Sequence, residues 1–212
     1  MAADRIATVD KLDIQAYQNL RTGAQVIEAD KFGEKVLRLA DGTFLKLFRR
    51  KRLISSAVLF PYAQRFANNA ATLAERGILC PRVIAVFRVA ALKRDMVHYH
   101  PLPGVTLRDL MRGGLSEEQA TRLRTQFNAF VRRLHDLGIY FRSLHLGNVV
   151  LTPADYLGLL DIFDLCVHRK ALRLFLRVRN LRLMEGIEAE RDWLDRSTLL
   201  APPGDGAAPP LP

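Results

Sequence analysis

The alternation of apolar and polar residues in the first half of the chain predicts a series of short β-strands. The strands are expected at 25–29, 36–40, 43–48, 83–89 and 96–99. The first two are separated by a turn at Asp30–Gly33. The next two flank Asp41 and Gly42, a dipeptide that strongly favours a two-residue hairpin. The pattern therefore predicts an antiparallel sheet.

Apolar residues at helical spacing predict three helices. They are expected at 56–76, at 106–111 and from Ser116 to about Gly138. Pro61 suits the first turn of the first helix. Ser116 with Gln119, and Thr106 with Asp109, have the spacing of capping boxes at the starts of the other two.

The second half of the chain has a different character. Strands are expected at 149–151 and 156–162, joined by a turn that starts at Thr152, and 166–195 is expected to be mostly helical. We therefore predict an α+β fold with a β-rich first lobe that contains one helix, followed by a short helical second lobe. The boundaries are expected at about 20–99 for the first lobe, 100–104 for a linker, 105–200 for the second lobe and 201–212 for a disordered, proline-rich tail.

Composition is that of a globular protein. The 212 residues are 49% hydrophobic and 25% charged, and no apolar run approaches the roughly 18 residues that span a bilayer. The N-terminal residues lack the apolar core of a signal peptide, and only Cys80 and Cys166 are cysteines, so we expect a reducing, cytoplasmic location. A net charge of +10 favours anionic partners.

Three polar residues interrupt apolar surroundings. Lys46 lies in the strand FLKLF, Asn148 opens the strand at 149–151, and Asp161 closes its partner strand. A hairpin would bring Asn148 and Asp161 together at its open end, where an amide oxygen and a carboxylate suit Mg²⁺. Each residue also has a simpler interpretation: an edge-strand lysine that reaches to solvent, a turn asparagine and a strand-end cap.

The segment LHDLGIYFRSLHLGNVVL, residues 134–151, resembles the catalytic loop of the protein-kinase fold. It is most similar to the bacterial lipopolysaccharide kinases, which phosphorylate heptose or Kdo sugars of the core, and to their toluene-tolerance relatives. Their loop reads roughly His-Arg-Asp-Leu-His-x-Gly-Asn. The resemblance implies a two-lobed kinase-like fold with Asn148 and Asp161 as Mg²⁺ ligands and Lys46 on the phosphates of ATP.

The same resemblance extends over about residues 30–165. It places Gly33 in the loop that covers the nucleotide, and it places the main chain of His98–His100 beside the adenine pocket. The stretch Arg76–Pro81 resembles the family's usual connection out of the first-lobe helix. The implied activity is transfer of phosphate from ATP to a sugar hydroxyl of a membrane glycolipid.

The base position of the loop differs from the family pattern. Ser143 stands where the family has aspartate, and Phe141 stands where it has histidine. Serine does not accept a proton near neutral pH as a carboxylate does, so His145 or Asp164 would have to serve as base, unless the proton leaves late in a loose transition state. The alternative is a degenerate pseudokinase that binds nucleotide or a partner without turnover.

A basic segment follows the kinase-like region. Residues 169–182 contain six arginines and lysines and no acidic residue: Arg169, Lys170, Arg173, Arg177, Arg179 and Arg182. One interpretation is a core helix with a solvated basic arc and an apolar arc made by Ala171, Leu174, Phe175, Val178 and Leu181. The other is a surface that docks, together with the cluster at 49–52, on anionic lipid or lipopolysaccharide core at the inner membrane. Few aromatic residues accompany these charges, so nucleic acid is not an expected partner.

Overall fold

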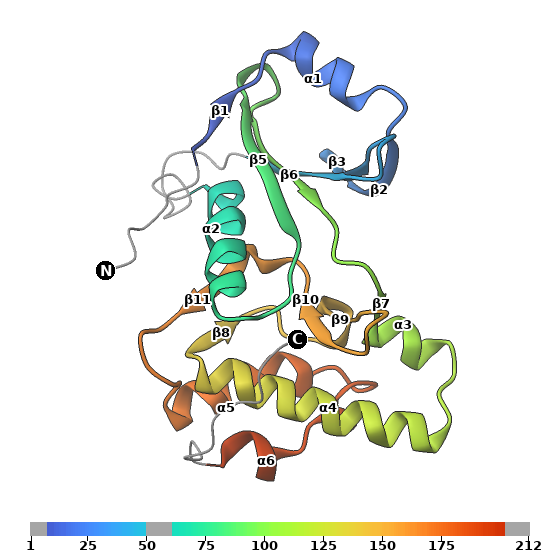
Figure 1. Ribbon diagram of the computed structural model, residues 1–212, viewed down its shortest axis with the longest axis vertical. Coiled ribbons are helices and arrows are strands. Elements are labelled where there is room, and N and C mark those ends of the chain that lie inside the picture. Colours follow the sequence, from blue (N-terminus) through green and yellow to red (C-terminus); the bar gives the residue numbers. More distant parts are fainter. Residues whose placement is uncertain (1–7, 50–60, 202–212) are drawn as a thin grey trace. The chain divides into compact units, whose positions relative to one another are not determined.

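The computed structural model describes residues 8–49 and 61–201, and the fold is α+β (Figure 1). Contacts divide the chain into two compact units. The first unit comprises the described residues up to Glu75 together with Cys80–Leu102, and the second comprises Arg76–Leu79 and the described residues from Pro103 onward. The division after Leu102 falls within the segment expected as a linker. Each unit is described by itself below.

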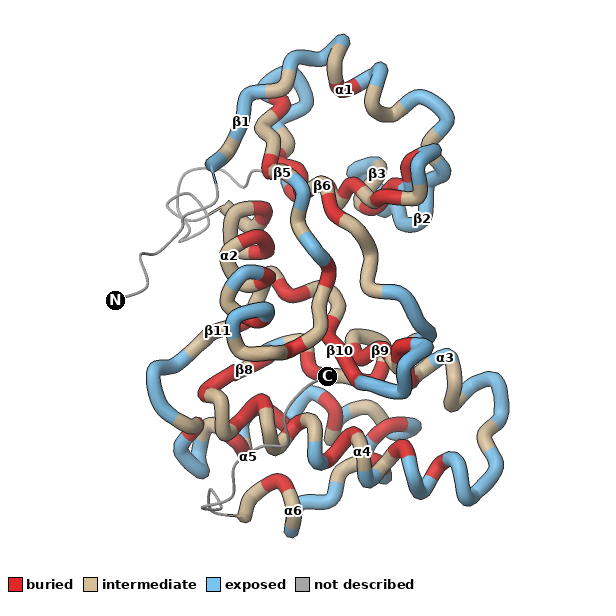
Figure 2. The backbone as a smooth tube through the Cα atoms, in the orientation of Figure 1, coloured by how far each residue is buried: buried red, intermediate tan, exposed pale blue. Residues whose placement is uncertain are grey.

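A six-stranded sheet with the order β1-β5-β6-β4-β3-β2 forms the first unit. Its strands are β1 (Asp10–Lys11), β2 (Gln25–Asp30), β3 (Gly33–Arg38), β4 (Phe44–Arg49), β5 (Arg82–Val89) and β6 (Arg94–His100). All neighbours are antiparallel except β1 and β5. The five predicted strands are therefore confirmed, and β3 and β4 form the predicted hairpin, whereas β1 was not predicted. The predicted two-residue loop is wrong: the Leu39 amide donates to the Thr43 carbonyl, so the loop has three residues, 40–42, and ends on Gly42 with a φ of +82°. The edge strand β2 is exposed along its whole length, whereas β6 is mostly buried (Figure 2).

The sheet packs apolar residues on both faces because successive side chains of a strand point to opposite sides. On one face, Leu45 and Met96 join a buried cluster that includes Tyr17. On the other face, the Tyr99 ring lies 5.3 Å, centre to centre, from that of Phe66 in α2 (Tyr62–Glu75). The cross-strand register sets Lys46 opposite Val97, on the face that α2 covers.

Helix α1 (Ile14–Arg21) contradicts the prediction that the first lobe contains one helix and starts near residue 20. Asp13 caps this helix, since its carboxylate accepts a hydrogen bond of 2.7 Å from the Ala16 amide. Only Tyr17 of its eight residues is buried. The helix is only eight residues long, about two turns, so its apolar residues make too short a pattern to distinguish a helix from a loop in the sequence.

The long helix expected at 56–76 is observed as α2, and residues 56–60 of that range lie outside the described residues. The Arg65 amide donates to the carbonyl of Pro61, so Pro61 precedes the helix, as its missing N–H favours. Gly77 follows with a φ of +64°, which fits the left-handed conformation common just past helix ends.

Helices and two small sheets make up the second unit. Its helices are α3 (Leu107–Arg112), α4 (Glu117–Asp136), α5 (Leu174–Glu185) and α6 (Arg196–Leu200), with 3₁₀ turns η2 (Leu146–Asn148), η3 (Ile162–Asp164) and η4 (Arg191–Trp193). The capping box of Ser116 and Gln119 is present, and Thr106 caps α3. One sheet has the order β10-β9-β7, from β7 (Val105–Thr106), β9 (Val149–Leu151) and β10 (Leu157–Leu159), and the other pairs β8 (Ile139–Phe141) with β11 (Leu165–Val167).

Strand β10 is shorter than the predicted strand at 156–162. Asp161 adopts a left-handed conformation, with φ of +49° and ψ of +45°, and turns the chain into η3. An aspartate tolerates this conformation better than most residues, so the strand ends before it. The predicted end of α4 at Gly138 is confirmed, and a Cβ there would lie 2.6 Å from the His168 carbonyl oxygen. This close approach lets β11 pair with β8, which the sequence pattern did not reveal.

The basic segment is helical only from Leu174, and Arg177 is almost wholly buried, which contradicts the predicted basic arc. Burial is possible because the guanidinium is satisfied: it donates to the Leu172 carbonyl at 3.0 Å and to the Asp136 carboxylate at 2.6 Å. The predicted apolar arc is also wrong in part, since Leu174 and Phe175 are exposed. Of the predicted tail and of the cluster at 49–52, only Ala201 and Arg49 lie within the described residues.

Candidate functional site

Asn148 and Asp161 lie at the same end of the β9–β10 hairpin. The antiparallel register pairs Val149 with Leu159, and the Leu160 amide donates to the Asn148 carbonyl at 2.9 Å. Asp161 follows directly. The predicted hairpin is therefore confirmed, and the two residues expected as metal ligands are brought to its open end.

The Asn148 side chain is oriented by its amide nitrogen. Nδ2 donates to the Ser143 carbonyl at 2.9 Å and lies 3.2 Å from Nε2 of His145. Within the residues that the structure describes, the amide oxygen makes no hydrogen bond. A fixed carboxamide whose oxygen remains available is a suitable ligand for a hard cation.

Ser143 and Asp164 form a hydrogen-bonded pair behind this amide. The Ser143 hydroxyl, just after β8, donates to Oδ2 of Asp164 in η3. Burial raises the pKa of the Asp164 carboxyl, and the nearby Asp161 carboxylate raises it further, against the lowering effect of the Ser143 hydrogen bond. The other oxygen, Oδ1, is buried and accepts no hydrogen bond of normal geometry from the described residues. A carboxylate of raised pKa therefore lies one hydrogen bond away from the Ser143 hydroxyl.

His145 is partly buried beside the same residues. Burial lowers the pKa of its imidazole and the Arg108 guanidinium lowers it further, while the Glu190 and Asp161 carboxylates oppose these effects. The contact between its Nε2 and the Asn148 amide nitrogen requires an unprotonated Nε2, as expected for a neutral ring. Ser143, His145, Asn148, Asp161 and Asp164 thus form one cluster, which we call the loop cluster.

Two residues that the sequence analysis missed hold the loop in place. Glu190 is only 1% exposed, and its carboxylate accepts from the Leu146 amide at 2.9 Å and from Nε of Arg108 in α3 at 2.6 Å. A Cβ on Gly147 would lie 2.7 Å from the Arg108 guanidinium, so the glycine lets the arginine pack against the loop. Gly147 was the one residue of the loop whose type indicated a close contact. Glu190 gave no such indication, because it is 44 residues from Leu146 in the sequence.

The other four predicted site residues belong to the first unit. Lys46 is half-buried on β4, and its Nζ lies 5.9 Å from the centre of the Phe48 ring. Gly33 begins β3 with a φ of +105°, in the predicted turn. The His98 main chain is inside the sheet, paired with Leu45 and Ala85, and its Nε2 lies 2.7 Å from the Thr43 hydroxyl.

His100 differs from His98 in its main-chain surroundings. It pairs with Arg82 of β5, whereas the pairing of β6 with β4 ends one residue earlier, at Tyr99. A main-chain contact from this segment to a nucleotide would therefore fall to His100. Across residues 8–49 and 61–201, no group of three or more histidine, cysteine, aspartate and glutamate side chains is arranged for a metal ion. A Mg²⁺ ion would thus depend on Asn148 and Asp161, with phosphate oxygens as further ligands.

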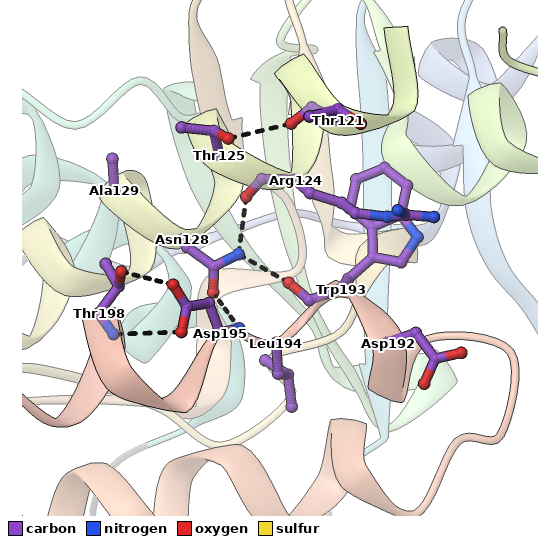
Figure 3. Close-up of a pocket in the computed structure, with 10 residues that line it drawn as sticks. All are labelled: Thr121, Arg124, Thr125, Asn128, Ala129, Asp192, Trp193, Leu194, Asp195 and Thr198. Carbon is purple, nitrogen blue, oxygen red and sulfur yellow. Dashed lines mark hydrogen bonds between the residues drawn. The ribbon is translucent and has the colours of Figure 1, made fainter. Parts of the chain in front are cut away.

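A separate cavity of about 290 Å³ lies between α4 and the segment 192–198, and none of the predicted site residues lines it (Figure 3). Asn128 bridges its walls: Nδ2 donates to the Arg124 and Trp193 carbonyls, each at 2.7 Å, and Oδ1 accepts from the Asp195 amide at 2.8 Å. Both the nitrogen and the oxygen of this amide are hydrogen-bonded. The bonds to Trp193 and Asp195 fasten α4 to η4 and to the start of α6.

Comparison with known proteins found no family model and no curated protein sequence that matches this chain. Among the described residues, no helix has the length and apolar character needed to cross a membrane.

Proposed function

We propose that this protein binds Mg·ATP and transfers the γ-phosphoryl group to a sugar hydroxyl of a lipopolysaccharide-type glycolipid. The observation that carries the proposal is the loop cluster, in which one hairpin end combines an oriented amide oxygen, a left-handed aspartate and a serine–aspartate pair. The resemblance of residues 134–151 to the loop of lipopolysaccharide kinases supplies the acceptor class. Phosphoryl transfer depends chiefly on positioning and electrostatics, which such a cluster can provide.

Four residues of the loop cluster, Ser143, Asn148, Asp161 and Asp164, have a part in this proposal. Asn148 and Asp161 would hold Mg²⁺, which supplies neutralisation of phosphate charge, and Lys46 would contact the phosphates. The acceptor hydroxyl forms a bond to the γ-phosphorus while the bond to the β-phosphate oxygen breaks, so ADP leaves. The proton of the acceptor passes to Asp164 through the Ser143 hydroxyl that is bonded to it. The raised pKa of Asp164 makes this carboxylate a stronger base than an ordinary aspartate.

A second candidate is a pseudokinase that binds nucleotide without turnover. The observation in its favour is that Ser143 and Phe141 occupy the places of the family's aspartate and histidine. In addition, α2 carries no acidic residue before Glu75 that could pair with a strand lysine. Both candidates require Mg·ATP binding, and only the first requires consumption of the γ-phosphate.

Thermal unfolding with and without Mg·ATP tests the shared step. At a ligand concentration about 100 times Kd, binding stabilises the folded state by about 2.7 kcal/mol, which raises Tm by about 5–10 °C for a chain of this size. We expect this rise for the wild type only when Mg²⁺ is present, and we expect Asp161→Asn to abolish it. Asparagine keeps the tolerance for the left-handed backbone while removing the charge, which alanine would not do.

Asp155 provides a matched control in the same hairpin. It is an exposed aspartate with a φ of +62°, in the turn opposite the loop cluster, so Asp155→Asn removes an equal charge from an equally unusual backbone. This variant should respond to Mg·ATP as the wild type does. An unchanged response in Asp161→Asn would refute the metal assignment, and no response in the wild type would refute nucleotide binding. Transfer of the γ-phosphate of ATP to purified lipopolysaccharide, with release of ADP, then separates kinase from pseudokinase.

A further inference from the structure

Helix α5 presents an unusual combination of side chains to solvent. Residues at i, i+1, i+4, i+5, i+8 and i+9 share one face of a helix, and here they are Leu174, Phe175, Val178, Arg179, Arg182 and Leu183. Phe175 and Leu174 are 63% and 58% exposed, the two largest exposed fractions among the large hydrophobic residues of the described chain. Leu183 is 44% exposed.

The opposite face of α5 is fixed within the second unit. Arg177, Asn180, Leu181 and Met184 are buried there. The Asn180 Oδ1 accepts from Nε2 of His135 in α4 at 3.0 Å, and its Nδ2 donates to the Phe141 carbonyl of β8. The helix is therefore held in one orientation, and its apolar and basic outer face is a fixed property of the fold.

Positive charge surrounds the exposed apolar residues. Five cations are exposed along and just before the helix: Arg169, Lys170, Arg173, Arg179 and Arg182. In the part of the chain that the structure describes, none of them forms an ion pair. The first acidic residue that follows, Glu185, is bonded to Arg196 of α6. The face thus combines strong net positive charge with leucine and phenylalanine side chains in water.

We propose that this face of α5 binds the surface of an anionic phospholipid bilayer. Lipid phosphates would attract the five cations, while Leu174, Phe175 and Leu183 would enter the boundary between headgroups and acyl chains. The helix would lie in the plane of the membrane surface, because its buried face remains packed in the second unit. This inference does not rest on the proposed phosphoryl transfer, since it concerns a different surface and requires no nucleotide.

The composition of the face favours a bilayer over other anionic or apolar partners. A second copy of the chain would bring five unpaired cations against five others, which like charges oppose. A nucleic acid would satisfy the arginines but would offer no apolar surface to the leucines, and Phe175 is the one aromatic residue on the face for base stacking. An anionic bilayer satisfies both the charged and the apolar residues.

Sedimentation with vesicles tests the proposal, using phosphatidylcholine alone and phosphatidylcholine mixed with phosphatidylglycerol. We expect binding to the mixed vesicles only, weakened by added salt. Reversal of two charges in Arg179→Glu/Arg182→Glu should lower the partition coefficient by about a hundredfold. Removal of the aromatic ring in Phe175→Ala should lower it by about tenfold. Both substitutions are on the exposed face, so Trp193 fluorescence should show unchanged unfolding.

Exposed residues elsewhere provide matched controls. Arg38→Glu/Arg112→Glu changes net charge by the same amount, and Phe32→Ala removes the other strongly exposed phenylalanine, which is 50% exposed. Both controls should bind as the wild type does. Equal losses in the control and α5 variants would overturn the proposal, as would equal binding to neutral vesicles. A dimer that the α5 charge reversals dissociate, or tighter binding to duplex DNA than to mixed vesicles, would also overturn it.

Discussion

The two units of the molecule are stabilised in different ways. The first unit buries mainly aliphatic and aromatic side chains, and its buried polar residues within the described chain are Thr43 and Asp95. The second unit buries Asn128, His135, Thr152, Arg177, Asn180 and Glu190. Each of these six makes at least one directional hydrogen bond.

This difference shows in which unit the positions of buried side chains must be held most closely. Apolar packing tolerates small shifts, whereas a buried arginine or glutamate is stable only when its partners lie at hydrogen-bonding distance. In the second unit these bonds join segments that are distant in the sequence: Arg177 joins α5 to α4, and Glu190 joins the segment that contains the loop cluster to α3. The second unit, which contains the loop cluster, is thus the one whose interior depends more on hydrogen bonds of defined geometry.

Replacement of Arg177 should give the largest effect. Arg177→Ala removes the bonds to Leu172 and Asp136 and leaves a cavity, so we expect the free energy of unfolding to fall by about 4 kcal/mol. Urea unfolding followed by the fluorescence of Trp193, the single tryptophan and a residue of the second unit, measures the loss. Arg179→Ala, an exposed arginine on the same helix, should change it by less than about 0.5 kcal/mol. Equal effects of the two variants would show that the buried, hydrogen-bonded arginine stabilises the second unit no more than an exposed arginine does.

Acid should weaken the second unit through His135. Burial lowers the pKa of His135 to about 4, from an ordinary value of 6.5, and the Arg177 guanidinium contributes, against the hydrogen bond to Asn180. As pH falls from about 6.5 to about 4, the unfolded chain takes up a proton that the folded chain refuses. Stability should therefore fall with decreasing pH, by a total on the order of 3 kcal/mol.

The measurement is urea unfolding at several pH values, again followed by Trp193. His135→Gln should flatten this part of the pH dependence, whereas His168→Gln, at an exposed histidine, should leave it unchanged. A pH dependence that survives in His135→Gln would show that other groups cause it.

The surface of the second unit should give the smallest effect. Arg122 donates two bonds to the Asp155 carboxylate, but the two side chains are 52% and 59% exposed. Solvent screens such a pair, so Arg122→Ala should lower the free energy of unfolding by about 0.5 kcal/mol and lose even this difference in high salt. A loss that approaches that of Arg177→Ala would mean that burial does not distinguish strong ion pairs from weak ones here.

Much of the first unit could be predicted from the sequence because apolar alternation and turn chemistry agree there. The hairpin of β3 and β4 is an example, since both strands and the position of the turn are encoded within ten or so neighbouring residues, although the loop has three residues and not the predicted two. Helix α1 could not be predicted in the same way, because eight residues are too few for a helical periodicity to be recognised.

The loop cluster was accessible to prediction for a related reason. Asn148 and Asp161 are joined by a short hairpin, so local register brings them together. The residues that hold the loop could not be predicted, since Glu190 and Arg108 look like surface charges in a sequence and become buried and half-buried through partners far along the chain. The exposure of Leu174 and Phe175 is the converse case, in which apolar residues of a helix point to solvent.

The contact between Glu190 and the Leu146 amide has a consequence for synthesis of the protein. The ribosome completes the whole segment from β8 to η3 before it adds Glu190, which follows Leu146 by 44 residues. A nascent chain that ends at α5 therefore contains every residue of the loop cluster but lacks the carboxylate that fastens the loop. The hydrogen bond to the Leu146 amide can form only after translation has passed residue 190, so it is a late contact when the chain folds during synthesis.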